Sequence, residues 1–214
     1  MPFLEDLRDV RSSPAPPPRR LRRRDWREVE LASLDFETTG LDRRRDAIVS
    51  FGVVPVRRGR VLLGEAVHQL VAPDVPPSPS SMKVHQLLPE DLADAPSLEV
   101  ARRSLRSALE RRFVLAWFAE VEIAFLQRIF GGWHRSWVSR TIDVRRLVIR
   151  LEGTEPDVRE TLSSTANRYG VPVASPHDAL DDALVTAQLF LIVASRLAES
   201  GQGSVRDQLR ITSG

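Results

Sequence analysis

The chain has 214 residues, 42% of them apolar, which is enough for one domain with a sizeable core and short appendages. It contains no cysteine, so disulfides, thiolate zinc sites and a cysteine nucleophile are excluded, and any metal must bind carboxylates or histidines. No run of about 18 apolar residues could cross a bilayer, and the N-terminus carries acids where a signal peptide carries bases. We therefore expect a soluble, cytoplasmic protein without a membrane partner.

The first 25 residues differ in composition from the rest of the chain. A Ser-Ser-Pro-Ala-Pro-Pro-Pro stretch favours extended backbone, and five of the six residues from 19 to 24 are arginines. We expect residues 1–25 to form an arm, followed by a domain at 26–199 and a C-terminal tail at 200–214. The arm is either simply solvated or touches phosphate groups, and the net charge of +2 does not decide between the two.

Short apolar runs predict the strands. Residues 31–36 end in a Thr-Thr-Gly turn and predict a buried first strand. Two β-branched runs, 47–56 and 60–71, are separated by Arg-Arg-Gly and predict a hairpin, so three antiparallel strands open the domain. A fourth buried strand is predicted at 113–117.

Apolar residues at helical spacing predict the helices. Ser97 and Asp178 stand where helix N-caps are expected, and Gly170 stands where a helix would stop. We predict helices at 98–109, at about 119–130, 143–151 and 158–169, and from 180 to 194. Strands followed by alternating strand and helix predict an α/β domain in which helices pack on a mixed sheet.

Two carboxylates stand one residue apart at the end of the first predicted strand. Because side chains alternate along a strand, Asp35 and Glu37 project to one face and Phe36 to the other. Hard cations such as Mg²⁺ or Mn²⁺ prefer oxygen ligands, and a pair of such ions suits phosphodiester hydrolysis. An Asp-x-Glu pair alone is weak support for a metal site, because acids at a strand end are more often solvated.

The longer string Leu34-Asp-Phe-Glu-Thr-Thr-Gly-Leu41 is more specific, and with it the chain resembles the DnaQ-like (DEDDh) exonucleases, which include polymerase proofreading subunits. The resemblance covers about residues 30–198 and implies a ribonuclease H-like fold, a mixed five-stranded sheet flanked by helices. In that family the two acids of this first motif bind metal, which implies that role for Asp35 and Glu37. The family's first motif also contacts the substrate's 3′ end, and the matching residues here are Phe36, Thr38, Thr39, Gly40 and Leu41.

The family's third motif is matched by Pro176-His-Asp-Ala-Leu-Asp-Asp-Ala183. The resemblance implies that His177 is the general base and Asp182 a metal ligand. A histidine suits proton removal from water because the ordinary imidazole pKa is near neutrality. Asp178 is then a helix cap and Asp181 a surface acid, although a register shifted by one residue would exchange Asp181 and Asp182.

The second motif departs from the family pattern. Ala116-Trp-Phe-Ala-Glu-Val-Glu-Ile-Ala-Phe-Leu126 places Glu122 where the family has an aspartate that binds metal. Glutamate keeps the charge and the oxygens but is one methylene longer. Glu120 is a competing candidate two residues out of register. Trp117 and Phe118 replace the family's His-Asn and are interpreted either as core or as surfaces on which bases stack.

A segment between the motifs also matches the family. Residues 82–92 resemble its Val-His-Gly-Ile-Thr segment, which would put His85 near the substrate, with a solvated loop histidine as the alternative. Residues 141–143 resemble its Ile-Asp-Thr, and we interpret Asp143 as a helix cap.

Together these matches imply a 3′→5′ exonuclease. Asp35, Glu37, Glu122 and Asp182 would hold two Mg²⁺ or Mn²⁺ ions while His177 activates water, releasing nucleoside 5′-monophosphates from single-stranded or frayed DNA. The partners implied are nucleic acid 3′ ends and a polymerase or other replication or repair protein. Two alternatives are a catalytically impaired nucleic-acid-binding or scaffold protein and an exonuclease that trims RNA.

Overall fold

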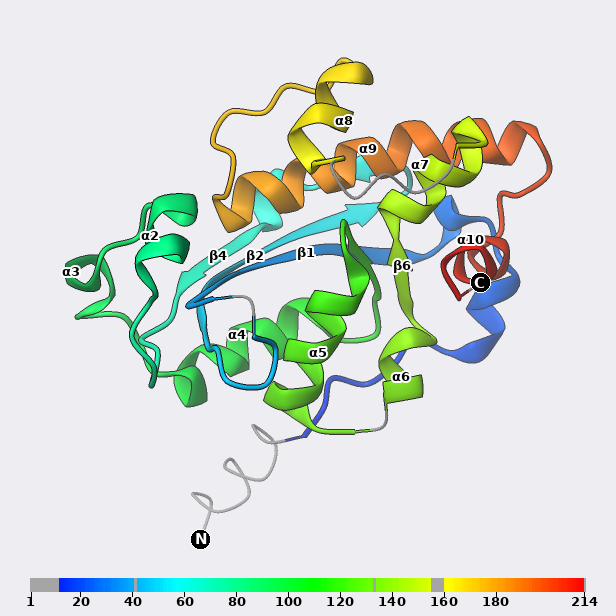
Figure 1. Cartoon of the computed structure of the whole chain (residues 1–214). Coiled ribbons are helices and arrows are strands. Elements are labelled where there is room, and N and C mark those ends of the chain that lie inside the picture. The colour runs from blue at the N-terminus through cyan, green and yellow to red at the C-terminus, as the bar shows by residue number, and fades with distance from the viewer. Residues whose placement is uncertain (1–11, 41, 133, 155–159, 214) are drawn as a thin grey trace, which may run out of the picture.

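The computed structural model describes residues 12–40, 42–132, 134–154 and 160–213. Within these residues a twisted sheet is covered on both faces by helices (Figure 1). Leu41, which the first motif assigns to the substrate, lies outside the described residues. No helix in the described ranges combines the length and the apolar character needed to span a membrane.

The sheet is mixed. Its strands are β1 (Glu30–Thr38), β2 (Ile48–Arg57), β3 (Arg60–Val61), β4 (Val67–Leu70), β5 (Phe113–Ala116) and β6 (Thr141–Asp143). The order is β3-β2-β1-β5-β6, with β4 also paired to β2; β1 runs antiparallel to β2 and parallel to β5, and β5 is parallel to β6.

The expected third strand is divided in two. The run at 60–71 forms β3 and β4, which both pair with β2, because a 3₁₀ turn at Leu63–Glu65 interrupts the extended backbone between them. The described sheet therefore has six strands where the sequence predicts five.

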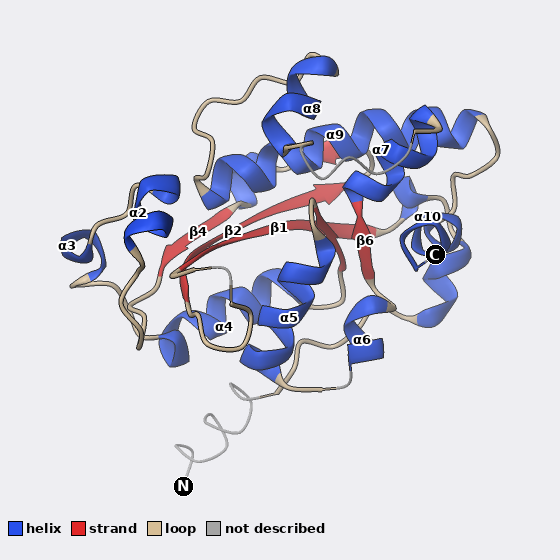
Figure 2. Cartoon of the chain, viewed as in Figure 1, coloured by secondary structure: helices blue, strands red, loops and turns tan. Residues whose placement is uncertain are grey.

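Helices cover the two faces of the sheet in separate groups. They are α2 (Pro79–His85), α3 (Pro89–Leu92), α4 (Leu98–Leu109), α5 (Ala119–Phe130), α6 (His134–Val138), α7 (Val144–Glu152), α8 (Leu162–Arg168), α9 (Ala179–Glu199) and α10 (Val205–Ser213). In Figure 2, α7, α8 and α9 lie over one face and α4, α5 and α6 over the other. The predicted helices at 98–109 and 119–130 coincide with α4 and α5, whereas α2, α3, α6 and α10 were not expected.

Strand β1 separates two apolar clusters. Leu31 packs in the cluster under α9, while Leu34 and Phe36 pack in the cluster on the α5 side. This alternation turns Asp35 and Glu37 toward α9, as the spacing of the two acids predicts. Phe36 instead faces Phe125, with 6.1 Å between ring centroids.

The described part of the N-terminal segment lies against the domain. The backbone N–H of Ala15 donates to Glu110 at 3.0 Å, and the buried Arg140 donates to the carbonyl of Pro14 at 3.0 Å. The arginine-rich residues form a 3₁₀ helix, η1 (Arg19–Arg23), which packs beside α10. Val205, at the start of α10, donates its N–H to the carbonyl of Arg24 at 3.1 Å, so the segment that leads into β1 is tied to the C-terminal helix.

Candidate metal centre and active site

The carboxylates of β1 meet the first turn of α9 because a glycine allows close packing there. Asp35 is paired in register with Gly52 of β2. A Cβ at Gly52 would lie 2.1 Å from the carbonyl oxygen of Ala179 and 2.5 Å from the Cα of Leu180, so only glycine permits this contact. The start of α9 is thereby held over β1 and β2, and this brings Asp182 toward the two strand acids.

Three side chains from these elements converge. Glu37, His177 and Asp182 each offer a ligand atom, and these atoms all lie within 4.8 Å of one another. Asp182 Oδ2 accepts the backbone N–H of His177 at 3.1 Å, whereas Asp182 Oδ1 is buried without a hydrogen-bond partner in the described residues. An unpartnered buried carboxylate oxygen is costly unless a cation or donor meets it, so this oxygen fits a metal ligand.

Asp35 and Glu122 lie outside that group of three but are electrostatically part of the same cluster. Burial raises the pKa of Asp35 well above its ordinary value, and the charges of Glu122, Glu37 and Asp182 raise it further. Burial also raises the pKa of Glu122 to about 8, and Glu122 Oε2 has no partner among the described residues. Like charges this close require protons or a bound cation, and a divalent ion would favour the ionised forms.

The remaining two acids follow the same pattern. Burial raises the pKa of Glu37 to about 8, with a further contribution from Asp182. Burial raises the pKa of Asp182 to about 6, although the His177 backbone hydrogen bond opposes this shift. The donor set, four carboxylates without a thiolate, matches the hard divalent ions Mg²⁺ and Mn²⁺.

The turn before α9 sets the position of His177. Its side chain is exposed and its backbone has φ +64°, a left-handed conformation that is uncommon for a residue other than glycine and often found at functional sites. Asp178 then caps the helix by accepting the N–H groups of Leu180 and Asp181, each at 3.0 Å. His177 therefore stands at the mouth of the acidic cluster on a rigid helix cap.

Asp181 points away from the cluster. Its carboxylate accepts the N–H groups of Ala174 and Ser175, at 3.0 and 2.8 Å, and so shapes the preceding loop. Asp182 is the acid of this pair that lies with Glu37 and His177.

The two glutamates of α5 differ in their exposure to solvent. Glu122 is buried at 4% exposure, whereas the side chain of Glu120 is 66% exposed and forms an ion pair with Arg43 at 3.5 Å. The start of α5 is anchored by Asp143, which accepts the N–H of Ala119 at 3.1 Å and also caps α7 through Arg146. Asp143 thus fixes the helix that carries Glu122.

The other residues of the first motif mainly build its loop. Thr39 donates its hydroxyl to Asp46 at 2.9 Å, and Thr38 donates to the carbonyl of Gly40 at 2.7 Å. A Cβ at Gly40 would lie 2.5 Å from the Asp46 carboxylate, so this loop is closely packed. Phe36 is buried on the opposite face and is not exposed toward the cluster.

His85, at the end of α2, lies near the motif rather than in a solvated loop. The side chain is buried, and its Nδ1 accepts the N–H of Leu87 at 3.0 Å. Burial lowers its pKa, the nearby Thr38 backbone opposes the shift, and His177 contributes to lowering it. His85 is therefore close to both the first and the third motif.

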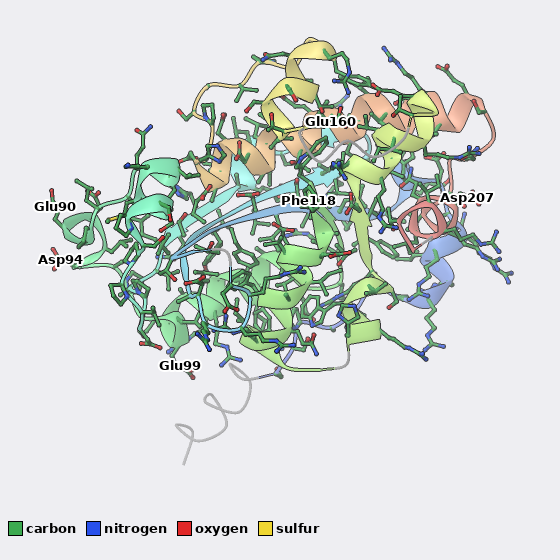
Figure 3. The ribbon with its side chains drawn as sticks, viewed as in Figure 1. Glu90, Asp94, Glu99, Phe118, Glu160 and Asp207 are labelled. Atoms are coloured by element: carbon green, nitrogen blue, oxygen red, sulfur yellow. The ribbon has the colours of Figure 1, made fainter. Side chains whose placement is uncertain are left out.

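Phe118 is a residue of the second motif whose exposure the sequence left open. Trp117 is buried, but Phe118 is 45% exposed and lies at the start of α5 (Figure 3). The guanidinium carbon of Arg145 lies 4.9 Å from the centroid of its ring. Phe118 follows the carboxyl end of β5 as the N-cap of α5 and precedes Glu122 by four residues of the chain.

A family model described as Exonuclease (RNase_T) matches residues 33–190, which include all four acids and His177. The chain belongs to this exonuclease family. The resemblance to the DnaQ-like enzymes inferred from the motifs is thus confirmed.

Relatives of the exonuclease include parts of much longer proteins. The PolC-type DNA polymerase III of Thermotoga maritima is 29% identical over 179 residues, covering 81% of this chain and 12% of that polymerase. A DNA polymerase III subunit epsilon-like protein of Rhodobacter capsulatus is 27% identical, covering 81% of this chain and 25% of that protein. The chain therefore spans a small part of the length of these relatives.

Solved structures share the fold of the exonuclease. Exonuclease X in complex with 5′ overhanging duplex DNA has a TM-score of 0.63 and 24% identity, covering 85% of this chain and 99% of that one. The nuclease domain of 3′hExo, a DEDDh family member bound to rAMP, has a TM-score of 0.64 and 15% identity, covering 84% and 96%. The expected fold class, a mixed sheet of ribonuclease H-like type flanked by helices, is confirmed.

In metal-free buffer the free energy of unfolding of the exonuclease should fall as the pH rises from about 5 to about 8. The native state raises the pKa of Glu37 from 4.5 to about 8, so it retains protons that the unfolded chain has released. Stability is then lost as the pH rises through this interval. Chemical denaturation in EDTA at several pH values measures the effect.

The matched variants for this experiment are Glu122→Gln and Glu120→Gln. The first removes a buried acid and should flatten the pH dependence, while the second removes an exposed acid and should leave it unchanged. A wild-type stability that increases over the same interval would contradict a buried, mutually repelling cluster.

Proposed function

We propose that the chain is a divalent-metal-dependent 3′→5′ exonuclease that releases nucleoside 5′-monophosphates, with single-stranded or frayed DNA as the favoured substrate. The observation that carries the proposal is the convergence of Glu37, Asp182 and His177, with the buried Asp35 and Glu122 acting on the same cluster. In the proposed reaction water attacks the terminal phosphorus, the bond from phosphorus to the 3′ oxygen breaks, and that oxygen takes up a proton.

The roles of the chain's own groups follow from their surroundings. Asp35, Glu37, Glu122 and Asp182 would hold two Mg²⁺ or Mn²⁺ ions, which would supply charge stabilisation for the phosphoryl oxygens. His177 is exposed at the mouth of the cluster and removes the proton from the attacking water. Its cap hydrogen bond to Asp182 fixes the backbone from which the imidazole extends.

The altered second motif favours retained activity over a purely binding role. Glu122 is buried, one of its carboxylate oxygens has no hydrogen-bond partner among the described residues, and its charge raises the pKa of Asp35. Such burial is costly unless a cation meets the carboxylate, so it favours a site that still binds metal. The longer glutamate side chain can reach the cluster from α5, which Asp143 anchors at its first residue. Glu122 is therefore proposed as the third metal-binding acid.

The substrate preference also remains a proposal. Relatives include DNA polymerase III proteins, whereas one structural neighbour is described as a 3′-exonuclease that recognises a histone mRNA stem-loop. Metal-assisted hydrolysis acts on the phosphodiester and not on the sugar, so the metal chemistry itself does not choose between DNA and RNA. A proofreading or repair role with a polymerase partner is favoured by the polymerase relatives.

Purified protein with Mg²⁺ or Mn²⁺ should shorten 5′-labelled single-stranded DNA from its 3′ end. His177→Ala should lower the rate by about 10²–10⁴-fold because a general base is lost. Asp182→Asn should lower it at least comparably, while the neighbouring Asp181→Asn should remain within a few-fold of wild type. Gel analysis of DNA and RNA of the same sequence measures both activity and preference.

Two outcomes would contradict this assignment. Loss of activity in Asp181→Asn with near wild-type activity in Asp182→Asn would mean that the register of the third motif is wrong. A folded protein that shortens neither DNA nor RNA would support the binding or scaffold alternative, and a strong preference for RNA would oppose a role in DNA proofreading.

We further propose that Phe118 stacks on a base near the 3′ end. Phe118→Ala should raise KM for single-stranded DNA by about 5- to 160-fold, because stacking on an aromatic side chain contributes about 1–3 kcal/mol per base. The kcat should change little and Phe118→Trp should restore the KM. Leu63→Ala, which truncates a similarly exposed apolar side chain on the β3–β4 connection, is the control. Steady-state kinetics in which Phe118→Ala matches Leu63→Ala would refute the stacking role.

A further inference from the structure

A groove of about 520 Å³ lies at the junction of the N-terminal segment, α6 and α10. Three elements far apart in the sequence contribute arginines to it. These residues are Arg19, Arg22, Arg23, Arg135, Arg206 and Arg210. We name this surface the arginine groove.

Acids of the described residues do not neutralise the arginines of the groove. Within the described ranges none of the six forms an ion pair with an acid, whereas the adjacent Arg24 pairs with Glu28 at 3.2 Å. Five of the six are exposed, and Arg22 is half-buried. Gathering like charges is unfavourable, so three elements that converge on unpaired guanidinium groups favour a polyanionic ligand.

A second hollow, of about 730 Å³, continues the basic surface around α10. It shares Arg210 with the arginine groove and adds Arg146 and Arg150 of α7. The one acid in its lining, Asp207, is engaged by Ser204, whose hydroxyl and N–H both donate to that carboxylate. The positive surface is therefore broader than a single phosphate requires.

The arginine groove lies at the opposite end of the sheet from the acids. It flanks η1, which leads into the first residues of β1, while Glu37 lies at the carboxyl end of the same strand. Seven residues of strand separate Glu30 from Glu37, a span of about 23 Å. In duplex DNA this distance corresponds to about seven base pairs.

We propose that the arginine groove binds the phosphate backbone of duplex nucleic acid behind a 3′ end held at the acidic cluster. The inference rests on the proposed function. The groove supplies affinity without reading sequence, because arginines that contact phosphates carry no base information. The arginine groove adds affinity only when the substrate is long enough to span the sheet, so a short single strand does not engage the groove.

The test compares two triple variants that lose the same charge. The groove variant combines Arg23→Gln, Arg135→Gln and Arg206→Gln, which removes one exposed arginine from each of the three elements. Affinity for a long duplex with a short single-stranded 3′ overhang is measured by fluorescence anisotropy in EDTA over a series of salt concentrations. EDTA prevents hydrolysis during the measurement.

The control variant combines Arg60→Gln, Arg103→Gln and Arg111→Gln, three exposed arginines outside the groove. The groove variant should flatten the slope of log affinity against log salt by about 2 to 3, since each lost duplex phosphate contact removes about 0.9. The control should keep the wild-type slope. Circular dichroism checks that both variants are folded.

The results separate this inference from the proposed function. Hydrolysis of the short overhang strand alone, with Mg²⁺, should be equal in the wild type and both variants. A flattened slope without any hydrolysis would sustain the groove and contradict the exonuclease proposal. Equal slopes in the groove and control variants would overturn the inference and leave an acidic protein as the ligand to examine.

Discussion

The close packing of α9 on β2 at Gly52 is the contact on which the site depends. The missing side chain at Gly52 lets the Ala179 carbonyl approach to a distance that a Cβ would not tolerate. Because Gly52 is the register partner of Asp35, the first turn of α9 is fixed directly over the face of β1 that carries Asp35 and Glu37. One glycine contact thus brings together acids that are separated by about 145 residues of chain, and it does so through rigid elements rather than loops.

This convergence has an electrostatic consequence. Four buried or half-buried carboxylates share one end of the sheet, and burial raises the pKa of each, while repulsion from other acids of the cluster adds to the shift at Asp35 and Glu37. The fold therefore retains a local instability that a divalent cation would relieve, as expected for a site organised for binding rather than for stability. The arginines of the groove at the opposite end, which form no ion pair within the described part of the chain, are separated from these acids by the length of the sheet, so the two charges do not cancel.

Much of the site follows from local pattern, and the rest depends on packing between distant segments. The alternation of β1 predicts the shared face of Asp35 and Glu37, and the spacing of the third motif predicts the capped helix that carries Asp182. Local pattern carries no signal for the contact at Gly52, because Ala179 is remote in sequence. Composition likewise carries no signal for contacts with distant residues, and it therefore predicts a separate arm before residue 26. In the structure the described part of this segment packs on the domain, where Arg140 donates to the carbonyl of Pro14.

Calorimetric titration of Mn²⁺ into Gly52→Ala, beside Gly64→Ala, tests the assembly of the site most directly. A Cβ at Gly52 would collide with α9, whereas one at Gly64 would meet nothing within 4 Å. If α9 docking assembles the cluster, folded Gly52→Ala should bind Mn²⁺ at least about tenfold more weakly than wild type, because displacement by about 1 Å has large effects at such sites. Gly64→Ala should bind like wild type. Wild-type affinity in folded Gly52→Ala would contradict the claim that this contact positions the metal-binding acids.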